Sequence, residues 1–320
     1  MTEPQGPTFP RQTASFVRER MAQFGLHPEV RYGQNFLIDL NLLELIVEAA
    51  QLAPSDLVLE VGTGTAGLTT RLAQRAGHVV TVEIDAQLAE LARSNLGPTD
   101  RVTLICRDVL KNKHTLAPEV MEAIARQMES LRLPRYKLVA NLPYNIATPL
   151  ISNLLASDRR PSLMVVTVQK EVADRMLASP GTKDYGALSV WVQSLATVEM
   201  IRVLPPTVFW PRPKVDSAIV RIALQESWRE KFVDLAFFHT MVRALFFHRR
   251  KFLRKVVISA TKDRLDKPTI DRLLDQLELP VTARTEELPV PKIQQLVETL
   301  RLALAGDTGH PANYDLADGD

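Results

Sequence analysis

The chain has a single cysteine, Cys106, among its 320 residues. One thiol excludes an internal disulfide framework and a cluster of metal-binding thiolates. The six histidines show no spacing typical of metal ligands, so we expect no metal site. No apolar run reaches the roughly 18 residues that a membrane-spanning helix needs, and residues 1–10 lack the apolar core of a signal peptide. The formal net charge is only +2 and identifies no class of partner. These absences predict a soluble, cytoplasmic protein.

Over most of its length the chain alternates apolar runs of strand type with amphipathic runs of helical type. This alternation predicts an α/β fold, a Rossmann-like doubly wound sheet with helices on both faces. Residues 188–192, 198–203 and 218–223 look more like hairpin strands and favour an antiparallel edge. The other expected strands are 57–61, 78–83, 102–106, the run that ends at Asn141, and 163–169; the expected helices are 41–53, 68–75, 87–95, 118–131, 149–156 and 171–178.

The pattern changes near Gln225, after which apolar residues recur only at helical spacing. Helices are expected within 232–257, 269–277 and 290–304, which predicts a small α-helical second domain. We therefore divide the chain into an N-terminal extension, a ligand-binding α/β domain, a helical domain and an acidic tail that we expect to be disordered. Their limits are 1–32, 33–225, 226–305 and 306–320.

A glycine-rich segment, residues 62–67, follows the first strand of the expected sheet. It matches the G-x-G-x-x-G dinucleotide fingerprint, with Glu83 about 20 residues further on. Alone it predicts an NAD-dependent oxidoreductase, or a strand-to-helix turn without a ligand. Glu60 argues against NAD, because a carboxylate at the end of the strand would repel a pyrophosphate. No arrangement for hydride transfer is evident either.

S-adenosylmethionine carries no phosphate and fits the same segment better. Gly62 and Gly64 offer backbone room for its amino acid part, Glu83 offers an acceptor to the ribose diol, and Asp108 offers one to the adenine amine. All of these lie at the carboxyl ends of expected strands, where open α/β sheets bind their ligands. The plain alternative for the two acids is that they are solvated strand ends.

The most informative stretch is Asn141-Leu142-Pro143-Tyr144, at the end of another apolar strand. Proline fixes its own φ and biases the preceding residue to an extended conformation, so the backbone at Leu142 is held stiffly. The Asn141 side-chain oxygen and the Leu142 carbonyl can then accept hydrogen bonds from a planar amine, and the Tyr144 ring offers a face for stacking. This pattern predicts a pocket for the exocyclic amine of a nucleobase; an ordinary turn after a strand is the alternative.

With these blocks in place, the chain resembles the small-subunit ribosomal RNA adenine N6-dimethyltransferases, the KsgA/RsmA family. The resemblance runs from about residue 32 to residue 300, and its blocks are 33–37, 60–69, 82–85, 141–146, 209–217 and 249–254. It implies transfer of two methyl groups to N6 of each of two adjacent adenosines near the 3′ end of that RNA, with S-adenosylmethionine as cofactor. The implied partner is small-subunit ribosomal RNA or the immature 30S subunit.

The same resemblance supplies the site residues that we expect. The catalytic set is Asn141, Leu142, Pro143 and Tyr144, and the cofactor-binding set is Gln34, Asn35, Leu37, Glu60, Gly62, Gly64, Glu83, Asp108 and Asn141. The chain departs from the family at Ala66, where a third glycine is usual, at Thr63, Val109 and His248, and in a longer segment over 111–135.

Cations gather near the start of the helical domain. Between Arg243 and Arg264 there are eight Lys or Arg residues and one acid, Asp263. At helical spacing Arg250, Lys251 and Arg254 would share one face; that face is either simply solvated or, as the resemblance implies, in contact with RNA phosphates. The expected RNA-binding set is Lys214, Arg249, Arg250, Lys251 and Arg254, with packing against the sheet edge as the alternative for Lys214.

Two other functions stay open at this point. One is an RNA-binding ribosome-assembly factor whose methyl transfer is incidental or lost; the other is the NAD-dependent oxidoreductase. Nothing in the sequence demands more than a monomer.

Overall fold

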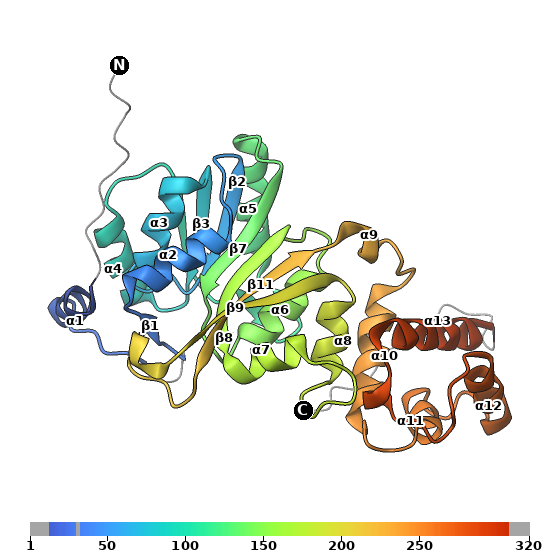
Figure 1. Ribbon diagram of the computed structural model, residues 1–320. Coiled ribbons are helices and arrows are strands. Elements are labelled where there is room, and N and C mark those ends of the chain that lie inside the picture. Colours follow the sequence, from blue (N-terminus) through green and yellow to red (C-terminus); the bar gives the residue numbers. More distant parts are fainter. Residues whose placement is uncertain (1–12, 30–32, 307–320) are drawn as a thin grey trace. The chain divides into compact units, whose positions relative to one another are not determined.

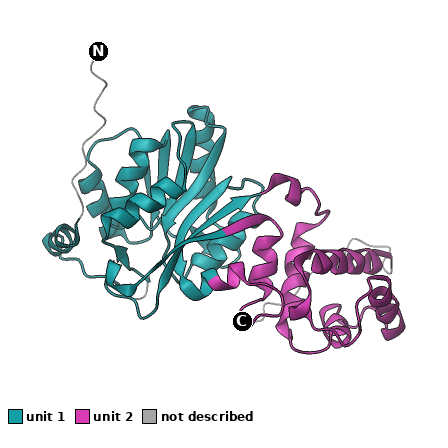
Figure 2. Ribbon diagram, viewed as in Figure 1, with its two compact units in different colours: residues 1–173, 199–224 teal, residues 174–198, 225–320 magenta. Residues whose placement is uncertain are grey.

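The computed structural model describes residues 13–29 and 33–306. Within them the chain forms two compact units, residues 1–173 with 199–224 and residues 174–198 with 225–320 (Figure 2). The expected acidic tail lies outside the described residues, except Gly306, which ends the last helix. The N-terminal extension is described only in part, and it contains a helix, Ala14–Gln23.

A seven-stranded sheet forms the centre of unit 1 in the order β4-β3-β2-β7-β8-β11-β9. The first five strands of that order pair in parallel, and β11 pairs antiparallel with β8. The strands are β2 (Asp56–Val61), β3 (His78–Glu83), β4 (Val102–Cys106), β7 (Arg135–Asn141), β8 (Leu163–Gln169), β9 (Ala196–Leu204) and β11 (Ser217–Leu224); the short pairs are β1 (Phe36–Leu37) with β10 (Phe209–Trp210), and β5 (Leu110–Asn112) with β6 (Thr115–Leu116).

Helices cover both faces of this sheet (Figure 1). Every residue of β2 and β3 is buried, although successive side chains of a strand point to opposite faces. On one face Val58 packs with Ile46 and Leu72, and on the other α5 contacts the central strands. The helices that begin in unit 1 are α1 (Ala14–Gln23), α2 (Leu40–Ala49), α3 (Gly67–Arg75), α4 (Ala86–Leu96), α5 (Pro118–Ser130), α6 (Ala147–Ala156) and α7 (Lys170–Leu177), with a 3-10 turn, η2 (Pro206–Val208). The expected α/β fold is confirmed.

Unit 2 is helical. It contains α8 (Ala187–Gln193), α9 (Glu226–Arg229), α10 (Leu235–Phe247), α11 (Leu253–Ala260), α12 (Lys267–Gln276) and α13 (Val290–Gly306), with a 3-10 turn, η3 (Thr285–Glu287). Asp234 and Asp266 cap α10 and α12 by accepting hydrogen bonds from backbone N–H groups of the first turn.

Residues 188–192 were expected to form an edge strand, and this prediction is wrong, because they lie in α8. Gly186 is the N-cap of this helix, and its N–H donates to the Ser189 hydroxyl over 3.0 Å. Trp191 stacks on His239 of α10, with ring centroids 4.2 Å apart. The β-branched and aromatic residues that suggested a strand are therefore buried against another helix. For the same reason residues 174–198 belong to unit 2, whereas the sequence placed the whole of 33–225 in one domain.

The helical pattern over 232–257 is also interrupted. Residues 248–252 leave the helix between α10 and α11. Phe252 pairs with Arg284 in an isolated β-bridge, and the Leu253 N–H donates to the Ala283 carbonyl over 2.7 Å. These pairings with a distant segment replace helical hydrogen bonds that the local sequence would support.

Candidate active site

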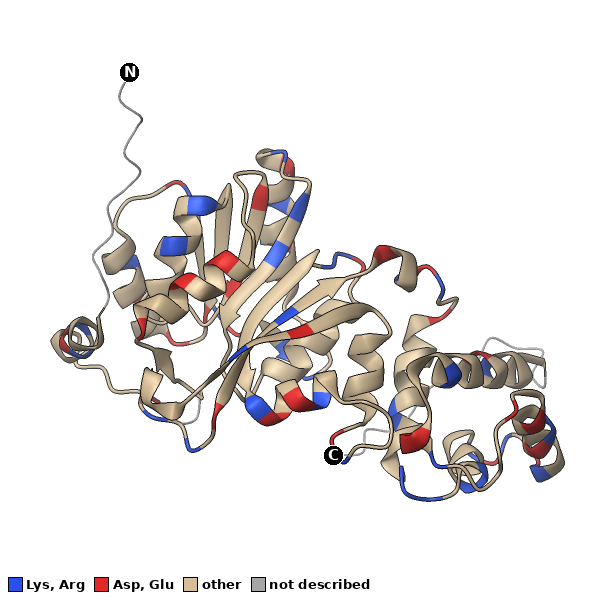
Figure 3. Ribbon diagram, viewed as in Figure 1, with Lys and Arg blue, Asp and Glu red and all other residues tan. Residues whose placement is uncertain are grey.

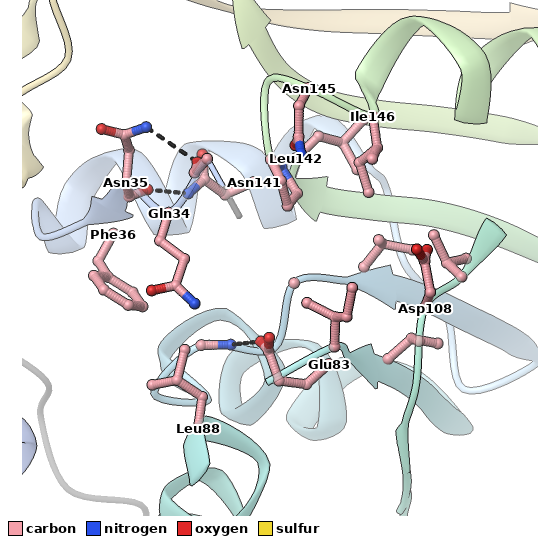
Figure 4. Close-up of a pocket in the computed structure, with 18 of the residues that line it drawn as sticks. Gln34, Asn35, Phe36, Glu83, Leu88, Asp108, Asn141, Leu142, Asn145 and Ile146 are labelled. Atoms are coloured by element: carbon pink, nitrogen blue, oxygen red, sulfur yellow. Dashed lines mark hydrogen bonds between the residues drawn. The ribbon is translucent and has the colours of Figure 1, made fainter. Parts of the chain in front are cut away.

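The order in which strands are added to the sheet reverses between β2 and β7. From β2 the chain builds β3 and β4 on one side, and β7 and β8 then lie on the other side. Such a reversal leaves a crevice at the carboxyl ends of the strands. An open cavity lies there. Of the expected site residues, Gln34, Asn35, Gly62, Gly64, Glu83, Asp108, Asn141, Leu142 and Pro143 line it; Figure 4 shows its walls.

The glycine segment passes close to two other parts of the cavity wall. A Cβ on Gly62 would lie 3.3 Å from the Pro143 ring, and one on Gly64 would lie 3.1 Å from the Phe36 ring. Both glycines have positive φ, which side chains disfavour. Ala66 also has a positive φ of 65° directly before α3, a conformation that costs an L-residue about 1–2 kcal/mol. The third glycine usual in the family would remove that strain.

Glu83 lies at the end of β3 and is only 4% exposed. One carboxylate oxygen accepts from the Gly64 N–H over 2.9 Å and the other from the Asp85 N–H over 3.1 Å. Burial raises the pKa of this carboxyl above its ordinary value, opposed by these hydrogen bonds. Figure 4 shows its carboxylate beside the glycine turn at the cavity wall. The backbone therefore fixes an acceptor at the place expected for a ribose diol.

Glu60 has a different environment from the one expected. Its carboxyl is 1% exposed and accepts from the hydroxyls of Thr69 and Thr81 over 2.6 and 2.7 Å. Burial raises its pKa to about 8, and the nearby charge of Glu83 acts in the same direction. A carboxyl that keeps its proton at neutral pH repels no pyrophosphate, so the argument from Glu60 against NAD is wrong. Glu60 and Leu37 line a smaller, adjacent cavity instead of the larger one.

Asn141 is held by the segment that precedes β1. Its side-chain nitrogen donates to the Asn35 carbonyl over 2.8 Å, a contact drawn in Figure 4. Because the nitrogen is engaged, the amide has one orientation and its oxygen is the group left to accept. No described residue donates to that oxygen or to the Leu142 carbonyl. Two neighbouring acceptors are thus open at the cavity, as the tetrapeptide predicted.

Tyr144 lies outside the residues that line the larger cavity. Its hydroxyl is 2.5 Å from the hydroxyl of Ser217 at the start of β11. Burial raises the pKa of the Tyr144 phenol, so it is no ready base. Its role in stacking on a base stays a prediction.

Asp108 follows β4, and one of its oxygens accepts from the Leu110 N–H over 2.9 Å. Its neighbour Arg107 also lines the cavity, which the sequence did not predict. The Arg107 guanidinium lies 2.6 Å from Glu119 of α5, in the longer segment. The sequence offered one signal for Arg107, which is its position directly after an expected strand. Other lining residues outside the predicted set are Gly33, Phe36, Val61, Val82, Ile84, Leu88, Val109, Asn145 and Ile146.

The expected RNA-binding cations fall into two groups. Arg249 donates to the Tyr185 and Lys183 carbonyls and lies 3.3 Å from Glu286. Arg254 pairs with Asp271 at 2.5 Å. These two guanidinium groups are therefore engaged within unit 2.

Arg250, Lys251 and Lys214 are exposed. The first two lie in the connection between α10 and α11, whose basic positions are blue in Figure 3. The prediction that they share a helical face with Arg254 is wrong, because residues 248–252 are not helical. Arg250 and Lys251 instead line a surface hollow with Lys255.

The described residues contain no candidate metal site and no candidate membrane-spanning helix. No cluster of three or more His, Cys, Asp or Glu side chains there is arranged to hold a metal ion. None of the described helices has the length and apolarity required to span a bilayer.

The residues present fit S-adenosylmethionine. The glycine turn leaves space that a Cβ would fill, and Glu83 and Asp108 offer carboxylate oxygens at the ends of successive strands beside the cavity. Fold and site together define an S-adenosylmethionine-dependent methyltransferase of the Rossmann-like class. The family model described as "Ribosomal RNA adenine dimethylase" matches residues 26–288. The chain belongs to this family, and it is an enzyme that methylates adenine in ribosomal RNA.

Individual relatives agree with the family. The chain is 37% identical to the "Ribosomal RNA small subunit methyltransferase A" of Halothermothrix orenii over 93% of this chain and 96% of that protein. It is 43% identical to the protein of the same name from Moorella thermoacetica, over 76% and 81%. Among solved structures, a dimethyladenosine transferase from Plasmodium falciparum gives a TM-score of 0.68 at 25% identity, covering 82% of this chain and 96% of that one. The 23S rRNA methyltransferase ErmE gives 0.59 at 25% identity, covering 83% and 100%.

Proposed function

We propose that this chain dimethylates N6 of two adjacent adenosines near the 3′ end of small-subunit ribosomal RNA. The relatives named as small-subunit enzymes are 37–43% identical, against 25% for the large-subunit enzyme, which supports the small subunit as target. The proposal includes the RNA or an immature 30S subunit as partner, action in the cytoplasm where that partner is made, and a monomeric enzyme.

One observation carries the chemistry. The Asn141 side-chain oxygen and the Leu142 carbonyl are open acceptors, and the hydrogen bond to Asn35 fixes which end of the Asn141 amide faces the cavity. An adenine amine has two N–H groups and a lone pair delocalised into the ring. Two acceptors that bind both N–H groups favour a more tetrahedral nitrogen and stabilise the charge that develops as its new bond forms.

S-adenosylmethionine, when bound, supplies an electrophilic methyl group. We assign Gly62, Gly64 and Asn35 to its amino acid part, Glu83 to its ribose and Asp108 to its adenine. The chain would contribute alignment, because the acceptors of Asn141 and Leu142 would hold the amine from a stiff turn. The target base must first be unstacked from its RNA. For the second transfer only one N–H is left, so one acceptor loses its partner.

The test is transfer of labelled methyl groups to small subunits that lack this modification. We expect up to four methyl groups per subunit and dimethyladenosine in the digest. Asn141→Ala should lower the rate about 100- to 1,000-fold, the usual effect of losing one such group. Asn112→Ala, at an exposed asparagine of β5, is the matched control and should leave the rate unchanged.

The outcomes separate the alternatives. An Asn141→Ala enzyme that works near the wild-type rate would refute the role of this side chain. Cofactor binding by the wild-type chain without any methyl incorporation would favour the assembly-factor function or a different RNA.

A further inference from the structure

Phe247, the last residue of α10, is 78% exposed, more than any other large hydrophobic residue described. Its neighbour Phe246 is 9% exposed and packs edge-on against Tyr185, with centroids 5.7 Å apart. The hydrophobic core of unit 2 therefore uses Phe246, and Phe247 contributes little to it. A single exposed phenylalanine is ordinary by itself, so its surroundings decide whether it has a function.

The surroundings of this ring are basic. Phe247 lines a surface hollow with Arg175, Lys183, Arg243 and Arg249, and Asp184 is the one acid there. The side chains of Arg175, Lys183 and Arg243 are exposed, and no described residue makes an ion pair or hydrogen bond with them. Arg243 precedes Phe247 by four residues on α10, so the two share a face of the helix.

The hollow is firmly built although its rim is exposed. Arg249 donates to the Lys183 carbonyl over 2.8 Å and to the Tyr185 carbonyl, which ties this segment to the end of α10. The Tyr185 hydroxyl donates to the Leu288 carbonyl over 2.8 Å. The His248 ring packs edge-on against Phe247, with centroids 4.7 Å apart. The cations and the exposed ring are thus presented from a fixed floor.

We propose that Phe247 is a stacking platform for an unpaired base of the RNA substrate, with Arg243, Lys183 and Arg175 binding the phosphates on either side. Aromatic rings interleaved with cations are the usual arrangement for holding single-stranded nucleic acid, because every base has a π-face and every nucleotide a phosphate. RNA is recognised chiefly at such splayed-out bases. This inference rests on the proposed function and names a contact of the helical unit that is separate from the methyl-transfer cavity.

The test compares binding of a labelled 12-nucleotide single-stranded RNA and of an RNA duplex of similar charge, by fluorescence anisotropy across a salt series. Phe247→Ala should weaken binding of the single strand about tenfold, as loss of one stacked base does. Its salt slope should stay unchanged, because stacking releases no counterions. Phe247→Trp should retain the affinity, and Val233→Ala, at another exposed apolar residue of unit 2, is the matched control.

The cations give the complementary result. Arg243→Gln with Lys183→Gln should lower the salt slope by about 0.7 for each phosphate of a single strand that the protein no longer neutralises. Duplex binding should respond to this pair of substitutions and be insensitive to Phe247→Ala.

Equal affinity of wild type and Phe247→Ala for the single strand would overturn the inference, as would a Phe247→Leu protein that binds like wild type. Unchanged RNA binding with weaker binding to whole small subunits would overturn it in favour of a protein contact. Failure of the proposed function looks different, because the wild-type chain would then transfer no methyl groups to small subunits.

Discussion

The polar groups of the cavity in unit 1 and the cations of unit 2 are held in different ways. In the cavity, one hydrogen bond to the backbone orients Asn141 and one orients Asp108, and each keeps an oxygen to which no described residue donates. Glu83 is oriented by two, one backbone N–H on each carboxylate oxygen. In unit 2, Arg249 and Arg254 direct their guanidinium groups to internal partners, whereas Arg250 and Lys251 are exposed. The acceptors at the strand ends are therefore held in place and still face the cavity. Each of these four cations is either held by internal partners or exposed to solvent.

The largest effect should come from breaking a buried ionic group in unit 1 and comparing it with an exposed one in unit 2. Asp56 is fully buried and accepts from Arg135 at 2.6 Å and Lys137 at 2.8 Å. Asp56→Ala leaves Lys137 without a counter-charge and should cost about 3–5 kcal/mol. Asp271→Ala removes the half-exposed pair with Arg254 and should cost about 1 kcal/mol or less. Urea unfolding curves measure both, and equal losses would contradict the contrast.

Glu83 tests whether the fixed acceptors of the cavity bind the cofactor. Glu83→Gln keeps the size of the side chain but turns an N–H₂ group toward a backbone N–H, of Gly64 or of Asp85. We expect S-adenosylhomocysteine to bind about 30- to 150-fold more weakly, from roughly 2–3 kcal/mol for a lost bond to a charged group. Isothermal titration calorimetry gives the dissociation constant, with Glu90→Gln at an exposed position of α4 as control. Unaltered affinity would remove Glu83 from the site.

The buried carboxyl of Glu60 predicts a pH dependence of stability. Its pKa is raised from 4.5 to about 8 in the folded chain, so between these values the folded state holds a proton that the unfolded state has lost. Stability from this group is therefore complete below the unfolded pKa and falls as the pH rises toward 8, by up to a few kcal/mol.

Glu60→Gln should remove this slope, because glutamine does not ionise. The measurement is the free energy of unfolding at intervals from pH 5 to 9 for both proteins. Two parallel curves would show that Glu60 is charged in the folded chain.

The smallest effect concerns the cations that remain free. Arg250→Glu with Lys251→Glu should weaken binding of ribosomal RNA and lower the salt slope by about one unit for each phosphate that is no longer neutralised. Arg249→Gln should act mainly on thermal stability, because its partners are Tyr185, Lys183 and Glu286. The comparison fails if the double reversal leaves the salt slope unaltered. It also fails if Arg249→Gln changes the salt slope more than the double reversal changes it.

The outcome at individual residues shows where sequence reasoning works. The limits of β3, β4 and β8 match the expected strands. Strands of a sheet that is covered on both faces are nearly continuous apolar runs, which leave little ambiguity. The expected strand over 188–192 is α8, and the expected face of Arg250, Lys251 and Arg254 does not exist. In both cases contacts with distant residues, Trp191 with His239 and Phe252 with Arg284, override the local pattern.

The sequence by itself determined the α/β fold and the acceptors at the ends of its strands, because periodicity and strand-end position are local properties of the chain. Only the tertiary structure decided which groups are available. It neutralises Glu60 by burial, turns the Asn141 amide through a bond to Asn35, engages Arg249, and leaves Phe247 exposed. These states depend on partners far away in the chain, and burial and partnership are set only when those residues meet.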